Sequence, residues 1–260
     1  MINKMVEIVK DKGAQTERLK VILNSYKLIY KRDFDFYEVS LRIEELLATE
    51  PYLEAEKLAI VYEKMVHEKY DVPIITVRKN NKSYVIDGHH RCFSKWLLNQ
   101  EHISSYEIHN ELFKPPWWSK NILDIEMIKT GENVEEKIRD WVTCMDVLEY
   151  LRRIHGTNFK LIPMKLEVMN LIPTQYPQRI IGSRMPSKAP ILVLKYKERF
   201  YIIDGHNRTY YAFKKGERYI DALVLVPARD VVPGIVLYSK KLGINSIKEF
   251  AKILEIDKFQ

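Results

Sequence analysis

The chain has 260 residues, of which 46% are hydrophobic and 30% charged, a composition typical of a folded protein of one or two domains. Its formal net charge of +7 favours an anionic partner, either a phosphate metabolite, nucleic acid or a membrane surface. No apolar run approaches the ~18 residues of a membrane span, and the first residues lack the apolar core of a secretory signal. Its two cysteines form no disulfide framework. We therefore expect a cytoplasmic protein that does not attach to membranes.

The first 113 residues alternate between helical and strand-like patterns. Apolar and charged residues alternate over 1–33, which predicts helix interrupted by a turn at Gly13. The elements expected after it are, in order, a helix over 55–69, a hairpin of strands 74–77 and 84–86, a helix over 92–99 and a strand over 103–108.

The segment 114–158 is predicted to connect two domains. It begins with a loop rich in proline and tryptophan over 114–120. Asn133, followed three residues later by Glu136, predicts the start of a helix that ends at Gly156. Near the C-terminus the pattern predicts one short helix over 246–254, without a recognisable helix-turn-helix.

A repeat dominates the organisation of the chain. Residues 73–103 recur at 190–220 without a gap, at a constant offset of 117, and 46–50 match 171–175. Identities include Pro73/Pro190, Ile74/Ile191, Tyr84/Tyr201, Ile86/Ile203, Asp87/Asp204, Gly88/Gly205, His89/His206, Arg91/Arg208 and Ile103/Ile220. We therefore predict a duplicated α+β domain with small mixed sheets and flanking helices. Copy one covers 1–113, the connecting loop and helix 114–158, and copy two 159–260 with a C-terminal helix.

Each copy places Asp-Gly-His-x-Arg between a strand and a helix, an arrangement that suits an anion. Gly88 permits a tight turn, and the helix N-terminus presents free N–H groups. Arg91 can clamp phosphate oxygens, while Asp87 can hold Mg²⁺ between phosphates. An ordinary capped turn is the alternative. Because both copies keep His and Arg, we favour an anion site in copy one, and both alternatives stay open for copy two.

The sequence Asp-Gly-His-His-Arg between a strand and a helix resembles the ParB/sulfiredoxin-like superfamily, whose small domain binds nucleotide phosphates at this loop. The likeness covers about 39–108 and again 165–226, and copy one is most similar to the free serine kinase branch. The resemblance implies Glu50 as the base that takes a proton from a substrate hydroxyl, with Asp87 beside the metal or substrate. Phosphates would be bound by Gly88, His89, His90 and Arg91.

Two departures from the family patterns bear on the activity. Ala48 replaces the proline expected two residues before Glu50, and His89 occupies the position where sulfiredoxins carry cysteine. Redox chemistry is therefore not expected. The function implied is an ADP- or ATP-dependent phosphotransferase that uses Mg²⁺ and acts on a small hydroxyl metabolite, with free L-serine as the candidate.

Copy two departs further, because Gln175 stands where copy one has Glu50 and cannot act as a general base. Its segment 173–179 resembles the arginine-containing box of partition proteins. The resemblance implies a binding role for Arg179, Asp204, Gly205, His206, Asn207 and Arg208. A degenerate copy kept for packing is an equal alternative.

The charge surplus lies in copy two. Residues 159–226 contain 12 basic and 5 acidic residues, against 9 and 11 in residues 39–108. The alternative function is therefore a ParB-like nucleic-acid-binding protein, partition or regulatory, with nuclease or nucleotide-switch activity. A regulatory nucleotide-binding scaffold without catalysis is a third hypothesis.

Overall fold

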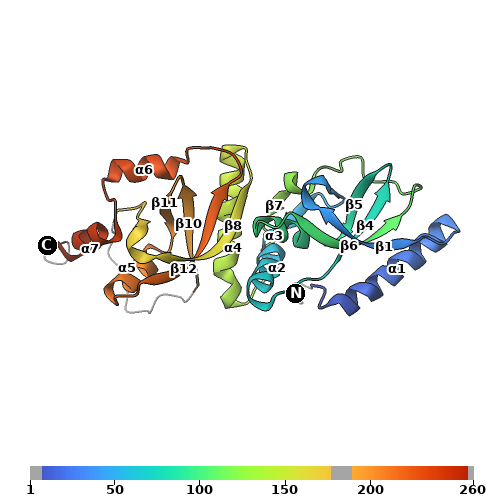
Figure 1. Cartoon of the computed structure of the whole chain (residues 1–260), viewed down its shortest axis with the longest axis horizontal. Coiled ribbons are helices and arrows are strands. Elements are labelled where there is room, and N and C mark those ends of the chain that lie inside the picture. The colour runs from blue at the N-terminus through green and yellow to red at the C-terminus, as the bar shows by residue number, and fades with distance from the viewer. Residues whose placement is uncertain (1–7, 177–188, 257–260) are drawn as a thin grey trace. The chain divides into compact units, whose positions relative to one another are not determined.

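The computed structural model describes residues 8–176 and 189–256 and divides into two compact units, Met1–Glu149 and Tyr150–Gln260 (Figure 1). Each unit contains a five-stranded sheet that combines parallel and antiparallel pairs with surrounding helices. The predicted α+β class, with small mixed sheets and flanking helices, is thus confirmed. The division falls inside helix α4 (Glu136–His155), whereas the sequence predicted a separate connecting segment over 114–158.

Unit 1 is built on a sheet of strand order β1-β6-β4-β5-β2. Leu19 of its first helix packs against Ile75, Val77 and Tyr84 of this sheet. The elements are α1 (Lys12–Tyr30), β1 (Phe36–Arg42), the 3-10 turn η1 (Ile43–Glu45), β2 (Leu47–Ala48), β3 (Tyr52–Glu54), α2 (Ala55–Glu68), β4 (Ile74–Lys79), β5 (Lys82–Asp87), α3 (His89–Leu97), β6 (His102–His109), η2 (Ile122–Asp124) and β7 (Glu126–Ile128). Helix α3 packs on α2, β4 and β6, so the loop between β5 and α3 is held by the sheet and two helices.

Unit 2 has a sheet of strand order β8-β12-β10-β11-β9. Its elements are β8 (Phe159–Glu167), η3 (Val168–Asn170), β9 (Leu171–Ile172), β10 (Ile191–Tyr196), β11 (Arg199–Asp204), α5 (His206–Lys214), β12 (Tyr219–Pro227), α6 (Gly234–Leu242) and α7 (Ile247–Ile256). Taken in chain order, the strands of the two sheets are arranged in the same way. In both units the first four residues of the central strand, β4 or β10, are buried. An uninterrupted apolar run is typical of such a strand.

The strand registers also match between the units. Leu47 pairs with Tyr84 in parallel, and Ile172 pairs with Tyr201 in the same way. The hairpin of unit 1 shifts register between Ile75 and Thr76, and the hairpin of unit 2 shifts between Leu192 and Val193, 117 residues later. The sequence repeat therefore corresponds to a repeat of topology and of pairing.

Three helix boundaries differ from the predictions. Gly13 lies in the first turn of α1, because the Asp11 side chain caps this helix by accepting a hydrogen bond from the Ala14 N–H at 2.9 Å. Helix α4 begins at Glu136, so Asn133 lies three residues before it. The motif helix α3 begins at His89, three residues earlier than expected.

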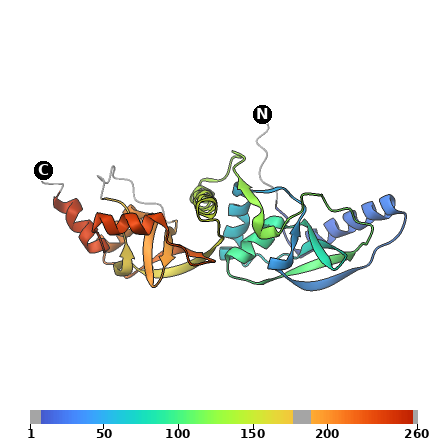
Figure 2. The ribbon, with the colours of Figure 1, turned by 90° about the horizontal axis from the view of Figure 1, so that it is seen from above.

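The C-terminal region contains two helices where the sequence predicted one. Helix α6 begins after Pro233 and ends at Gly243, whose φ of 70° is left-handed, and α7 follows at Ile247. Figures 1 and 2 show the two helices following one another at this end of the chain. Among the described residues, no helix is long and apolar enough to cross a membrane.

Candidate functional site

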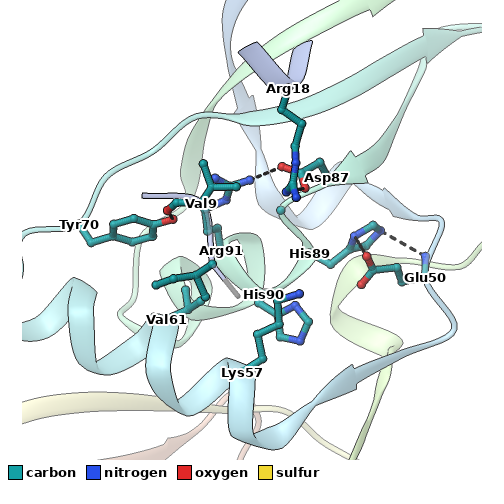
Figure 3. A pocket seen from close by; sticks show the side chains of 12 residues that line it. Val9, Arg18, Glu50, Lys57, Val61, Tyr70, Asp87, His89, His90 and Arg91 are labelled. Carbon is teal, nitrogen blue, oxygen red and sulfur yellow. Dashed lines mark hydrogen bonds and ion pairs between the residues drawn. The ribbon is translucent and has the colours of Figure 1, made fainter. Parts of the chain in front are cut away.

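A pocket of unit 1 lies where β5 ends and helix α3 begins (Figure 3). It brings together all six copy-one residues predicted for the site, which are Glu50, Asp87, Gly88, His89, His90 and Arg91. Six further lining residues were not predicted: Ile8, Val9, Arg18, Lys57, Val61 and Tyr70. The repeat thus predicts half of the lining residues, and the others come from the segment before α1, from α1 and α2, and from Tyr70 just after α2.

Gly88 is required by the geometry of the loop. Its φ of 102° lies in the left-handed region, and a Cβ there would lie 2.6 Å from Ile74 Cγ2 and 2.8 Å from Arg91 Nη2. Gly205 repeats this geometry, with a φ of 96° and Ile191 Cγ2 at 2.5 Å. The tight turn lets α3 begin directly after the strand, and the first residues of the helix, His89 to Arg91, line the pocket.

The Asp87 carboxylate is held by three side chains. Gln15 Nε2 donates to Oδ2 at 2.8 Å, Arg18 Nη1 donates to Oδ1 at 2.7 Å, and Arg91 Nη2 pairs with Oδ2. Burial by itself raises the pKa of Asp87, but Arg91, Gln15 and Arg18 together outweigh burial and leave the pKa below its usual value. Asp87 is therefore an ionised residue of the loop's own bonding network.

This network does not fit the predicted Mg²⁺ ligand role of Asp87. Both carboxylate oxygens already accept hydrogen bonds, and two of the three donors are guanidinium groups that repel a cation. Nor do the described residues contain a group of three or more His, Cys, Asp or Glu side chains arranged to hold a metal. Mg²⁺ bound to substrate phosphates would not need such a group.

Arg91 has an unused hydrogen-bond donor inside the pocket. Its side chain is 4% exposed, and Nη1 is buried with no hydrogen bond of normal geometry in the described structure. Arg91 does lie close to the Tyr70 hydroxyl, where it offsets part of the rise that burial causes in the pKa of Tyr70. A buried polar atom without a partner costs about 1 to 3 kcal/mol and calls for an explanation. The Tyr70 hydroxyl, which donates to the Val9 carbonyl at 2.6 Å, lies on the same side of the pocket (Figure 3). An anion would satisfy this Arg91 donor once a local side-chain shift exposes Nη1 to the pocket.

His89 is bonded to the segment that carries Glu50. Its Nε2 accepts hydrogen bonds from the backbone N–H groups of Thr49 and Glu50, at 3.1 and 3.2 Å. Because Nε2 is an acceptor, the ring proton resides on Nδ1, which lies 3.3 Å from Glu50 Oε1. With a fully buried side chain, His89 orients Glu50 and does not offer Nε2 to a phosphate.

Glu50 is ionised and accessible. Burial alone raises its pKa, but His89, His90 and Lys57 outweigh burial and leave the pKa below its usual value. Its side chain is 47% exposed, so a small molecule can reach the carboxylate. A carboxylate fixed in this way can accept a proton from a bound hydroxyl.

His90 and Lys57 connect the pocket to the start of α2. His90 Nε2 accepts a hydrogen bond from the Glu54 N–H at 3.1 Å. Burial, followed by the charge of Lys57, lowers the pKa of His90 to about 3, so the ring is neutral. Lys57 sits in the first turn of α2, where the helix dipole disfavours a cation. That unfavourable position is the sequence signal by which Lys57 could have been found.

Unit 2 repeats the histidine contact but not the free donor. His206 Nε2 accepts from the Thr174 N–H at 3.1 Å, as His89 does from Thr49. Arg208, however, donates to the Ala189 carbonyl at 3.0 Å and pairs with Asp204. Of the other predicted residues, Asn207 is exposed, Gly205 forms the turn, and Arg179 lies outside the described residues. In the described part of unit 2, Nη1 and Nη2 of Arg208 therefore both already have hydrogen-bond partners.

No protein-family model matches this chain, and no curated protein matches it. Support for a function therefore comes from the pocket and its motif.

Proposed function

We propose that unit 1 is a ParB/sulfiredoxin-like domain that binds the phosphates of ADP or ATP and transfers a phosphoryl group to a small hydroxyl metabolite. Unit 2 is then a second copy of this domain. The matched strand order, strand registers and hairpin bulges of the two units support duplication. The loop Asp87–Arg91 supports the family, because it joins a strand to a helix as the resemblance requires.

The observation that carries the proposal is the buried, unpartnered Nη1 of Arg91 at the N-terminus of α3. Backbone N–H groups, the positive end of the helix dipole and a guanidinium converge there, and each favours phosphate oxygens. Lys57 adds a cation on the α2 side of the same pocket, where its charge also helps to lower the pKa of Glu50. A ligand with two or more charged phosphates suits this combination.

Glu50 is the proposed general base. The oxygen of the metabolite hydroxyl attacks the terminal phosphorus, its proton passes to Glu50, and the bond from phosphorus to the leaving nucleotide oxygen breaks. ADP would yield AMP, and ATP would yield ADP. The low pKa of Glu50 is compatible with this role, because a loose phosphoryl-transfer transition state needs little proton removal in advance. Mg²⁺ would enter bound to the nucleotide, as part of the substrate.

The experiment is a transfer assay with ADP or ATP, Mg²⁺ and L-serine, followed by ³¹P NMR of the products. We expect phosphoserine from the wild-type protein and at least about a hundredfold loss of rate in Glu50→Gln, with ADP binding retained. Gln175→Ala, the matched change in unit 2, should leave the rate unchanged. Turnover that survives Glu50→Gln would exclude Glu50 as the base. Absence of turnover with any small alcohol would exclude the phosphotransferase.

A second candidate, nucleic-acid binding by unit 2, is favoured by its pair of terminal helices. Lys240, Lys241, Lys248 and Lys252 of α6 and α7 are all exposed. We expect duplex DNA to be retained at about 50 mM salt and largely released at about 200 mM, because phosphate contacts release counterions. The double variant Lys248→Ala and Lys252→Ala should reduce this salt dependence. Lack of binding at the lower salt concentration would eliminate this candidate.

A further inference from the structure

Helix α1, which precedes the first strand, carries two side chains that reach the loop at the pocket. Gln15 and Arg18 donate to the two oxygens of the Asp87 carboxylate, at 2.8 and 2.7 Å. Leu19 of the same helix is buried against the sheet, so the packing of α1 fixes both donors relative to the end of β5. Figure 3 shows Arg18 directed at Asp87 from the side of α1.

Gln15 is an unusual residue for its place. It is fully buried and does not line the pocket, and its Oε1 is buried without a hydrogen-bond partner among the described residues. A buried amide with an unsatisfied oxygen is unfavourable, and an apolar side chain would fill this position without that penalty. Glutamine at this position provides the hydrogen bond to Asp87, which an apolar residue could not make.

Unit 2 offers an internal comparison. The Asp204 side chain is 56% exposed and pairs with Arg208, whereas the Asp87 side chain is 18% exposed and has three partners. Among the described residues, no helix other than α5, which carries Arg208, contributes a side chain to Asp204, whereas α1 contributes two to Asp87. Arg208 uses Nη1 on the Ala189 carbonyl, while Nη1 of Arg91 is free. The α1 contacts and the free arginine donor thus occur together, in unit 1.

We infer that Gln15 and Arg18 are positioning residues, which hold both oxygens of Asp87 and thereby keep the Arg91 side chain, which pairs with the same carboxylate, aligned for a phosphate in the pocket. This inference rests on the proposed phosphate binding of unit 1. Because Gln15 does not touch the pocket, it acts on a ligand through Asp87 alone. Docking of α1 and binding of the anion are then linked, and each stabilises the other.

Gln15→Leu is the decisive variant, because it removes one bond to Asp87 without changing the charge of the pocket. In calorimetric titrations with ADP and with inorganic pyrophosphate, we expect affinity for both to fall on the order of tenfold. Without ligand, amide hydrogen exchange of the Cys92 N–H, which bonds to the Gly88 carbonyl, should become faster. Arg18→Ala should act in the same direction, and Arg18→Lys should restore most of the affinity. Lys20→Ala, an exposed change on the same helix, should alter neither quantity.

The outcomes separate this inference from the proposed function. If the wild-type protein binds neither anion, phosphate binding fails, while faster Cys92 exchange in Gln15→Leu alone still supports the positioning role. If the wild-type protein binds and both Gln15→Leu and Arg18→Ala bind equally well, the inference is overturned and the proposed function stands. An equal loss in Lys20→Ala would also overturn it. Arg18 is half exposed and also lines the pocket, so a loss of affinity in Arg18→Ala supports the positioning role only together with faster Cys92 exchange. These two readouts together keep the test available should Gln15→Leu fail to fold, and unchanged Cys92 exchange in Arg18→Ala would overturn the inference.

Discussion

The histidines of the two motif loops act first as buried acceptors. His89 and His206 each accept a backbone N–H from the segment that follows the edge strand, and Thr49 and Thr174 each donate a side-chain hydrogen bond to the neighbouring strand. The same local contacts therefore stabilise the loop within each copy. Keeping the histidine in both copies is explained by this contact, whether or not a ligand binds.

Burial of neutral histidines makes stability depend on pH. Burial lowers the pKa of His206 to about 4, and burial with Lys57 lowers that of His90 to about 3, from an unfolded value of 6.5. Below pH 6.5 these histidines therefore become protonated in the unfolded chain while they stay neutral in the folded chain. Each histidine contributes stability above this pH that is lost as the pH falls toward its folded pKa. We expect a loss of about 2 kcal/mol per histidine between pH 7 and pH 5.

Urea denaturation at the two pH values measures this loss. In His206→Gln the amide oxygen can still accept the Thr174 N–H, but the titrating group is gone. The decrease between pH 7 and pH 5 should then be smaller by about 2 kcal/mol. A pH slope unchanged from the wild type would contradict the neutral, buried state of His206.

The two motif glycines allow a paired substitution. Gly88→Ala and Gly205→Ala each force a Cβ into an isoleucine side chain at a left-handed φ, so each should lower the free energy of unfolding by about 2 to 4 kcal/mol. Gly88→Ala should also weaken ADP binding, because it shifts the first turn of α3. Unfolding curves and ADP titrations of both variants check this. Undiminished ADP binding by a folded Gly88→Ala protein would count against the site.

Among the elements, α2 shows a conflict between stability and binding. Its first turn carries Lys57, a cation at the positive end of a helix dipole, next to the pocket. We expect Lys57→Gln to raise the free energy of unfolding by about 0.3 to 1 kcal/mol and to weaken ADP affinity on the order of tenfold. Thermal unfolding and calorimetry provide the two measurements.

Lys64 is the matched control on the same helix, since it pairs with Glu68 four residues later on the surface. Lys64→Gln should leave ADP affinity unchanged. Equal losses in the two variants would indicate a general charge effect and would remove Lys57 from the site.

The repeat made much of the element order predictable. The offset of 117 predicted that two strand-loop-helix segments would be equivalent, and their hairpins do share a register shift at matching positions. Helix α6 was not predicted, because its boundaries depend on Pro233 and Gly243 rather than on a long apolar pattern. Local patterns fix the elements well where hydrophobic periodicity is strong and fix their ends less well.

The candidate site was predictable in part. The motif identified Asp87 to Arg91, and the resemblance identified Glu50, all of which line one pocket. Gln15 lies 72 residues from Asp87 in sequence, and Tyr70 lies 61 residues from Val9. Contacts over such distances leave no local periodicity or spacing to detect. The partners of Asp87 therefore needed the three-dimensional structure, and they changed its expected role from metal ligand to loop anchor.

At the scale of the whole molecule, net charge and the candidate anion site lie in different units. Copy two carries the basic surplus, with 12 basic and 5 acidic residues over 159–226, yet its Arg208 is already bonded. Copy one has 9 basic and 11 acidic residues over 39–108, yet its Arg91 keeps a free donor. Local arrangement, rather than overall charge, is therefore the basis on which we propose phosphate binding for unit 1.

Calorimetric titration of ADP into the whole chain tests this assignment most directly. The two arginines at equivalent positions supply the comparison, as Arg91→Gln and Arg208→Gln. We expect one site per chain in the wild type, at least about a tenfold loss of affinity in Arg91→Gln, and an unchanged affinity in Arg208→Gln. Two equivalent sites, or a loss that follows Arg208→Gln and spares Arg91→Gln, would contradict a phosphate site in unit 1.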